Sequence, residues 1–133
     1  MRFLVTGAQG CIGAWVVKQL LDQNLPVVTL DLGTNLERLE LISEHGASGL
    51  LERVAGRIED TELLAKLVKE REITHVIHLA AVLMPFCQTQ PVAGGMINVI
   101  GTLNVFQAAR DAGRPVRVVY ASSSAVWGPE DRS

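Results

Sequence analysis

Residues 6–13 read Thr6-Gly7-Ala8-Gln9-Gly10-Cys11-Ile12-Gly13, directly after an apolar run at 3–5 and at the start of a segment with helical apolar spacing. Gly7 allows a tight turn, Gly10 lets the backbone approach a pyrophosphate, and Gly13 lets the helix pack closely on the strand. The helix N-terminus offers free N–H groups and a positive dipole end to phosphates. A strand, this turn and a helix predict a dinucleotide-binding site. The alternative is a tight turn with no ligand.

Short apolar runs alternate with helical patterns along the rest of the chain. The runs are rich in β-branched residues and nearly continuous, as in strands covered on both faces. Strands are expected at 3–5, 27–30, 50–54, 76–79 and 116–120, and helices at 11–23, 35–45, 61–71 and 91–112. This order predicts an α/β fold, a Rossmann-like doubly wound parallel sheet of about five strands, in one domain over residues 1–133.

The composition excludes several classes of protein. Apolar residues make up 48% of the 133 residues and charged residues 20%, which argues against disorder. The net charge of −2 gives no basic excess, so neither nucleic acid nor a membrane surface is expected as a partner. The two cysteines, Cys11 and Cys87, favour a reducing compartment, and we expect a cytoplasmic protein. We expect no signal peptide, no membrane span and no metal site.

Asp31 ends the second expected strand, 18 residues after Gly13. A carboxylate at this place can accept hydrogen bonds from both hydroxyls of an adenosine ribose, and it would repel a 2′-phosphate. No arginine follows immediately, so the sequence favours NAD over NADP. The alternative is that Asp31 only starts a turn.

His78 lies within an apolar strand and is expected to be a core histidine with its hydrogen bonds satisfied.

Four motifs, in order and over nearly the whole chain, resemble the N-terminal part of the extended short-chain dehydrogenase/reductases, the NAD-dependent epimerase/dehydratase family. They are the turn at 6–13, Val76-Ile77-His78-Leu79-Ala80-Ala81, Asn98-Val99-Ile100-Gly101-Thr102-Leu103-Asn104-Val105, and Ser122-Ser123-Ser124-Ala125-Val126-Trp127-Gly128.

The resemblance implies an NAD cofactor and a role for each matching residue. Asp31 would hold the adenosine ribose, and Asn98 would hydrogen-bond near the nicotinamide end unless it lies on a solvated helix face. Arg57 and Ile58 replace an Asp-Ile/Val pair beside the adenine, where Arg57 either stacks on the base or is solvated. The pyrophosphate would be faced by Gly7, Gly10, Cys11, Ile12 and Gly13, and the cofactor would pass beside Leu79, Ala80 and Ala81.

The resemblance also implies an activity. Ser123, or Ser124 if the register is shifted by one, matches the active-site Ser/Thr that hydrogen-bonds the reacting oxygen of the substrate. The family transfers a hydride at a hydroxyl- or carbonyl-bearing carbon of a small molecule such as a nucleotide sugar. We therefore expect the NAD-binding portion of an NAD-dependent oxidoreductase, epimerase or dehydratase.

The family's catalytic Tyr-x-x-x-Lys pair is absent from the 133 residues. The only tyrosine, Tyr120, is followed four positions later by Ser124, and the last lysine is Lys69. We expect a chain that is incomplete at its C-terminus, before a sixth strand and the substrate-binding part, and inactive alone. The alternative is a non-catalytic NAD-binding or sensor module. In a chain that lacks the C-terminal part, the helix at 91–112 would have no neighbouring helix. Residues such as Met96, Ile100, Leu103 or Phe106 would then be exposed, and a homodimer through this helix is one expected arrangement.

Overall fold

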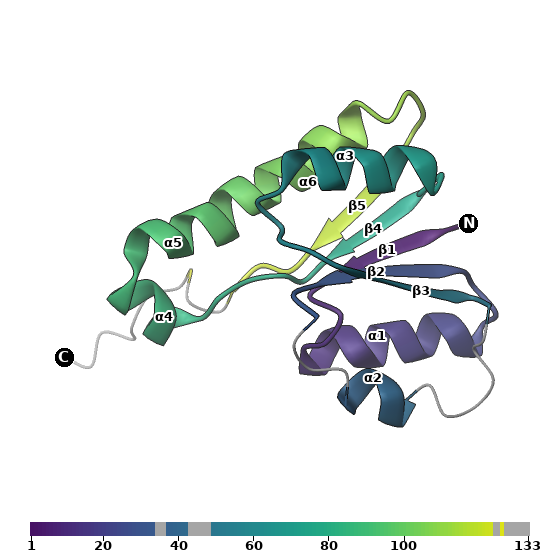
Figure 1. The fold of residues 1–133 in the computed structure, drawn as a ribbon, viewed down its shortest axis with the longest axis horizontal. Coiled ribbons are helices and arrows are strands. Elements are labelled where there is room, and N and C mark those ends of the chain that lie inside the picture. Colours follow the sequence, from purple (N-terminus) through teal and green to yellow (C-terminus); the bar gives the residue numbers. More distant parts are fainter. Residues whose placement is uncertain (34–36, 43–48, 124–125, 127–133) are drawn as a thin grey trace.

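Five parallel strands form one sheet in the order β3-β2-β1-β4-β5 (Figure 1). The computed structural model describes residues 1–33, 37–42, 49–123 and 126. The central strand pairs in register on both sides, with Phe3 opposite Val27 and opposite His75. The strands are β1 (Phe3–Thr6), β2 (Val27–Asp31), β3 (Leu51–Ala55), β4 (His75–His78) and β5 (Arg117–Tyr120). The expected α/β fold with a five-stranded Rossmann-like sheet is confirmed, and its strand order reverses beside β1.

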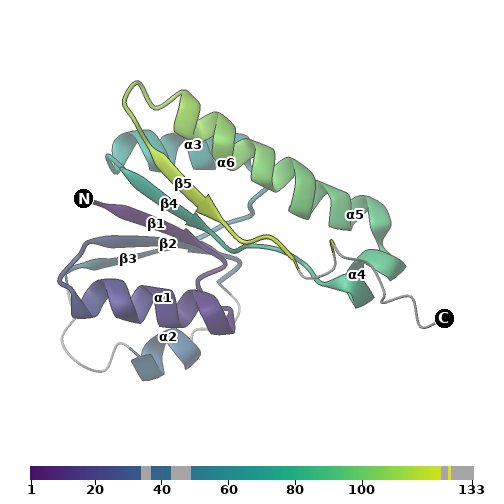
Figure 2. The same ribbon diagram turned by 180° about the vertical axis from the view of Figure 1, so that it is seen from behind.

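Helices cover both faces of this sheet (Figures 1 and 2). On one face lie α1 (Cys11–Asp22) and α2 (Glu37–Ile42), and on the other lie α3 (Thr61–Glu70) and α6 (Gly101–Arg110). The segment beyond the carboxyl ends of the strands carries α4 (Met84–Thr89), α5 (Pro91–Gly95) and a π-helical turn, η1 (Met96–Ile100). The remainder of the helix expected at 35–45 lies outside the described residues.

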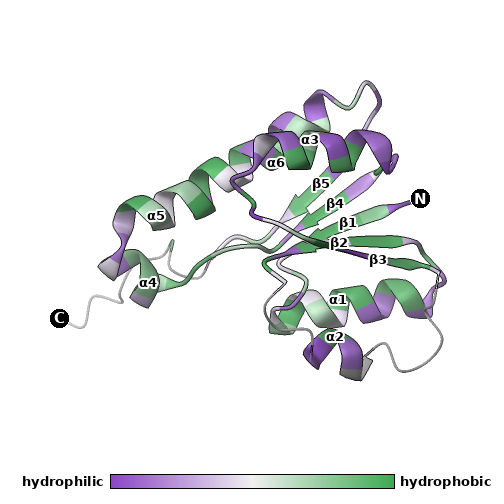
Figure 3. Cartoon of the chain, in the orientation of Figure 1, coloured by the Kyte–Doolittle hydropathy of each residue, from purple (hydrophilic) through white to green (hydrophobic). Residues whose placement is uncertain are grey.

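The near-continuous apolar strands are explained by a hydrophobic core on each face. Leu4 and Val5 are consecutive in β1 and point to opposite faces, and both are 0% exposed. Leu4 packs in the core beneath α3 and α6, and Val5 packs in the core beneath α1 and α2. The central strands β1 and β2 are accordingly mostly apolar, whereas β3 and β4 also carry polar residues (Figure 3).

Two helical features differ from the expectation. Helix α4 was not expected, because its six residues are too few for an apolar period; Pro85 in its first turn was the available signal. The helix at 91–112 is not uniformly α-helical, since η1 interrupts it between Gly95 and Gly101. A π-turn inserts one residue into the helical repeat and has no propensity signature of its own.

The run Pro91–Arg110 is long and apolar enough, by length and composition alone, to cross a membrane, with a mean hydropathy of 1.3. The match rests on length and composition only, so the expectation of no membrane span stays a prediction. A core helix of a folded domain passes the same test. Within α6, Val105, Ala108 and Ala109 are buried, and α6 contacts α3, β4 and β5.

The opposite side of the same helical run is apolar and exposed to solvent. The expected exposure of Met96, Ile100, Leu103 and Phe106 is confirmed, with between 37% and 57% of each residue accessible. The edge strand β5 is also poorly covered, and Tyr120 packs edge-to-face on Phe106, with ring centroids 5.7 Å apart. Exposed apolar faces are typical of contact surfaces, and the homodimer expected through this helix stays a prediction.

Candidate cofactor site

The glycine turn after β1 is held against two neighbouring strands. Gly7 has a φ of +68°, and a Cβ atom there would lie 2.7 Å from the backbone nitrogen of Ala80. The Gly7 N–H donates to the carbonyl oxygen of Leu30 at the end of β2, at 3.1 Å. A side chain is therefore excluded twice, by the backbone conformation and by the approach of the chain after β4.

Helix α1 begins directly after this turn. Its N-cap is Gly10, and no side chain among the described residues caps it. The first N–H groups of the helix therefore remain available for an anion. Gly13 was expected to let the helix pack on the strand, but its closest neighbour is the glycine turn. A Cβ atom at Gly13 would lie 2.2 Å from the Gly7 carbonyl oxygen. It lets the helix close on the turn itself.

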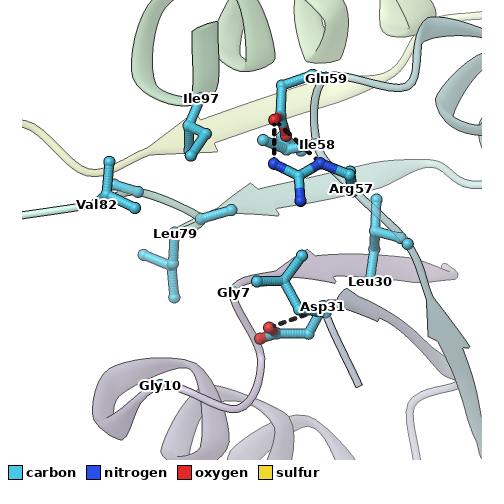
Figure 4. Close-up of a pocket in the computed structure, with 14 residues that line it drawn as sticks. Gly7, Gly10, Leu30, Asp31, Arg57, Ile58, Glu59, Leu79, Val82 and Ile97 are labelled. Carbon is cyan, nitrogen blue, oxygen red and sulfur yellow. Dashed lines mark hydrogen bonds and ion pairs between the residues drawn. The ribbon is translucent and has the colours of Figure 1, made fainter. Parts of the chain in front are cut away.

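Asp31 is placed at the end of β2, where its carboxylate faces the turn (Figure 4). Oδ2 accepts the N–H of Gln9 at 2.8 Å, and Oδ1 accepts the N–H of Leu32 at 2.8 Å. A carboxylate has about four lone-pair sites, so acceptor capacity remains after these two bonds. Asp31 thus fastens the glycine turn and still presents a negative charge beside it.

The loop after β3 closes the opposite side of the site. The Arg57 guanidinium forms an ion pair with Glu59, with Nη2 2.7 Å from Oε1 (Figure 4). The Arg57 side chain is 63% exposed, so this pair contributes little to stability. Ile58 is buried beneath α6, where a Cβ atom on Gly101 would lie 2.6 Å from Ile58 Cγ2. Of the two expectations for Arg57, neither foresaw the carboxylate partner.

Beyond β4 the chain is anchored by buried polar groups. His78 is 4% exposed and hydrogen-bonds Thr6 and Thr102, which confirms the expected satisfied core histidine. Burial lowers the pKa of the His78 imidazole below its ordinary value of 6.5. The Thr6 hydroxyl in turn accepts the N–H groups of Leu79 and Ala80, each at 3.3 Å.

These segments enclose a cavity of about 280 Å³ at the carboxyl ends of the strands (Figure 4). This is where ligands bind in open α/β sheets, beside the point at which the strand order reverses. Eight residues predicted from the sequence line it: Gly7, Gly10, Asp31, Arg57, Ile58, Leu79, Ala80 and Ala81. It is also lined by Leu30, Leu32, Gly56, Glu59, Val82 and Ile97, which were not predicted. The rule that sites form at strand ends was the signal available for Gly56, Glu59 and Val82.

Five predicted residues do not line this cavity: Cys11, Ile12, Gly13, Asn98 and Ser123. The Asn98 side chain is not on a solvated face, because Oδ1 accepts the Val82 N–H at 2.8 Å and Nδ2 donates to the Val82 carbonyl at 2.9 Å. It therefore holds a segment that lines the cavity. Cys11 and Ile12 are exposed at the start of α1. Ser123 is exposed, three residues beyond β5, whereas Ser124 and Trp127 lie outside the described residues.

Across the described residues, no group of three or more His, Cys, Asp and Glu side chains is arranged to hold a metal ion.

Comparison with known proteins gives concordant matches. A family model described as the NAD dependent epimerase/dehydratase family matches residues 3–133. The UDP-glucose 4-epimerase of Haemophilus influenzae is 37% identical over 134 residues, covering 96% of this chain and 38% of that enzyme. UDP-glucuronate 4-epimerase 4 of Arabidopsis thaliana is 34% identical over 131 residues, covering 94% of this chain and 30% of that enzyme.

A solved structure gives the same family likeness. The UDP-glucose 4-epimerase of Stenotrophomonas maltophila, crystallised with bound NAD and formylated UDP-arabinopyranose, superimposes with a TM-score of 0.82 and 31% identity, covering 98% of this chain and 39% of that one. The chain spans between 30% and 39% of the length of these relatives. The match over residues 3–133 shows that the chain belongs to the NAD-dependent epimerase/dehydratase family.

Proposed function

We propose that this chain is the NAD-binding portion of an enzyme that transfers a hydride at a hydroxyl- or carbonyl-bearing carbon of a nucleotide sugar. The observation that carries the proposal is the placement of Asp31. Its carboxylate lies at the end of β2, bonded to the glycine turn, and lines the same cavity as Gly7 and Gly10. A ribose acceptor next to a glycine-rich helix N-terminus is the arrangement that recognises NAD.

The size of the cavity supports a place for one half of the cofactor. A volume of about 280 Å³ lies at the small end of ligand pockets, which hold roughly 300–1,000 Å³. It suits the adenosine half of NAD, with the base between the loop after β3 and the chain after β4. The pyrophosphate would cross the N-terminus of α1, and the nicotinamide half would run toward η1.

A thermal-melt titration tests the binding. A ligand that binds only the folded state raises the melting temperature by mass action. NAD and ADP-ribose are expected to raise it, NADP to raise it less because of the Asp31 charge, and nicotinamide mononucleotide to leave it unchanged. The absence of a shift with NAD and ADP-ribose, on a chain that gives a cooperative melt, would contradict the proposal.

The chain alone is expected to bind NAD and to convert no nucleotide sugar, because the 133 residues lack a Tyr-x-x-x-Lys pair. In this family the tyrosine exchanges a proton with the substrate oxygen, which requires a tuned pKa. Assays with UDP-glucose and NAD check this, and turnover by the chain alone would show that another group supplies the proton. The alternative, a non-catalytic NAD-binding or sensor module, gains support if the gene encodes no such pair after Ser133.

A further inference from the structure

A row of buried hydrogen bonds crosses the sheet from the glycine turn to helix α6. The Thr6 hydroxyl, at the end of β1, lies 2.7 Å from Nδ1 of His78 in β4. Nε2 of the same imidazole lies 2.9 Å from the hydroxyl oxygen of Thr102 in α6. The Thr102 hydroxyl is also 2.7 Å from the carbonyl oxygen of Asn98. Three elements are thus joined through one histidine.

The donor and acceptor in each of these hydrogen bonds can be worked out from the Asn98 carbonyl at the end of the row. A carbonyl oxygen only accepts, so the single hydroxyl proton of Thr102 is donated to Asn98. Thr102 must then accept from His78, which places the ring proton on Nε2. A neutral imidazole carries one such proton, so Nδ1 of His78 accepts the hydroxyl proton of Thr6.

These bond directions fix the orientation of the Thr6 hydroxyl group beside the cavity. With its proton directed to His78, the Thr6 hydroxyl turns its lone pairs toward the N–H groups of Leu79 and Ala80, each at 3.3 Å. Both residues line the cavity, and the backbone between them lies against Gly7. The Leu79 N–H also donates to the backbone carbonyl of Thr6 at 3.1 Å. The ring proton therefore acts on the part of this attachment that passes through the Thr6 hydroxyl.

We propose that His78 is a positioning residue for the cofactor pocket: as the neutral Nε2–H tautomer it orients the Thr6 hydroxyl, which holds the Leu79–Ala80 backbone in place. The inference rests on the proposed function only for the ligand, because the hydrogen-bond order is a property of the chain by itself.

In the part of the chain that the structure describes, the elements packed against His78 place no charged group beside it that would support a protonated ring. On β1 its partner in register is Thr6, and on β5 it is Tyr120. On α6, Thr102 and, one turn later, Phe106 lie on the side toward β4 and β5. Among the described residues at these positions, Tyr120 is the one titratable group. Protonation would turn Nδ1 into a donor to the Thr6 hydroxyl oxygen. That oxygen would keep one lone pair for the N–H groups of Leu79 and Ala80, and its own proton would lose its acceptor.

The first experiment reads the tautomer directly. Long-range ¹H–¹⁵N NMR distinguishes the protonated from the unprotonated ring nitrogen of each histidine, and a His78→Gln variant assigns the signals against His45 and His75. A neutral Nε2–H ring near pH 7 is expected. An Nδ1–H ring, or an imidazolium, would overturn the proposal.

The second experiment separates positioning from stability. Thr102→Val keeps the shape of the side chain and removes the acceptor for Nε2–H, and Thr102→Ser keeps the hydroxyl. Thr102→Val is expected to weaken NAD binding about fivefold, as for the loss of one hydrogen bond, and to shift the Leu79 and Ala80 amide signals. Thr102→Ser is expected to restore both.

The outcomes are distinguishable from failure of the proposed function. A Thr102→Val variant that melts at a lower temperature, yet keeps the NAD dissociation constant and the Leu79 and Ala80 signals of the parent, would show a purely structural role. If the parent chain binds no NAD, the proposed function fails. The ring tautomer and the two amide signals still decide the role of His78, since neither readout needs a ligand.

Discussion

A Cβ atom on Gly13 would lie 2.2 Å from the carbonyl oxygen of Gly7. Gly7 is itself pressed against the chain after β4, where a Cβ atom would lie 2.7 Å from the nitrogen of Ala80. The first turn of α1, the glycine turn and the end of β4 therefore form one stack in which backbone lies on backbone. Because no flexible side chain can give way, the stack sets the position of the helix N-terminus in the site.

We predict that Gly13→Ala destabilises the chain by about 1–3 kcal/mol, the range for forcing extra atoms into a packed site, and weakens NAD binding as the turn moves. Gly95→Ala is the matched control. Gly95 is helical, with φ −64°, and a Cβ atom there meets nothing within 4 Å. It is expected to keep or raise stability by up to ~1 kcal/mol. Urea denaturation measures both, and equal effects would contradict the stacking argument.

A second prediction concerns the choice of cofactor. Asp31→Asn is expected to weaken NAD binding about tenfold, since hydrogen bonds to charged groups contribute roughly 1.5–3 kcal/mol. It should bring NADP closer to NAD in affinity, because the carboxylate no longer repels the 2′-phosphate. Arg38 lies nearby, with Nη1 3.4 Å from the Gln9 carbonyl oxygen, and supplies a positive charge for that phosphate.

Calorimetric titration with each dinucleotide measures these constants. Asp22→Asn is the control, because it removes the same charge from α1, where Asp22 forms an ion pair with Lys18 on the surface. If both variants change the NAD-to-NADP ratio alike, the effect is one of net charge and Asp31 has no specific role.

The sequence predicted the sheet and most of the cavity because these depend on local patterns. Apolar runs with β-branched residues fix the strands, and the order of elements then brings Gly7, Asp31 and Leu79 to one edge. The N-cap of α3 follows a local rule of the same kind, because Asp60 Oδ1 accepts the Leu63 N–H at 2.9 Å.

What could not be predicted depends on contacts between distant segments. The roles of Asn98 and Thr102 were not accessible because their partners, Val82 and His78, are 16 and 24 residues away along the chain. The ion pair of Arg57 with Glu59 depends on the path of the loop after β3. The π-turn at Met96–Ile100 likewise has no local apolar period that would distinguish it from an α-helix.

A third prediction is a pH dependence of stability. Burial lowers the pKa of His78 below its ordinary value of 6.5, so the unfolded chain binds more protons than the folded one just below that pH. Stability from this group is therefore complete above about pH 6.5 and is lost as the pH falls toward the lower pKa of the folded state. The slope for one group is at most about 1.4 kcal/mol per pH unit.

Urea denaturation between pH 5 and 8 measures this slope, with the His78→Gln variant as the reference that removes the group and leaves all other titrations in place. As the pH falls below 6.5, the free energy of unfolding of the parent should decrease relative to that of the variant. A difference that is constant across the range would show that His78 titrates alike in both states.

The last prediction concerns the apolar face of the long helical run. Val92, Met96, Val99, Leu103 and Phe106 are all exposed, and they follow one another at alternating spacings of four and three residues. Apolar residues at these spacings are the ones through which two helices pack, and here two of them, Met96 and Val99, belong to the π-turn. We propose that two copies of the chain associate through this apolar face.

Sedimentation equilibrium should show a reversible dimer. The double substitution Val99→Lys with Leu103→Lys should dissociate it, because each buried lysine would lack a partner. Ala65→Lys, on the exposed side of α3, adds a charge away from this apolar face and should leave the dimer intact. A parent chain that stays monomeric at every concentration, or a dimer that survives the double substitution, would place the association elsewhere.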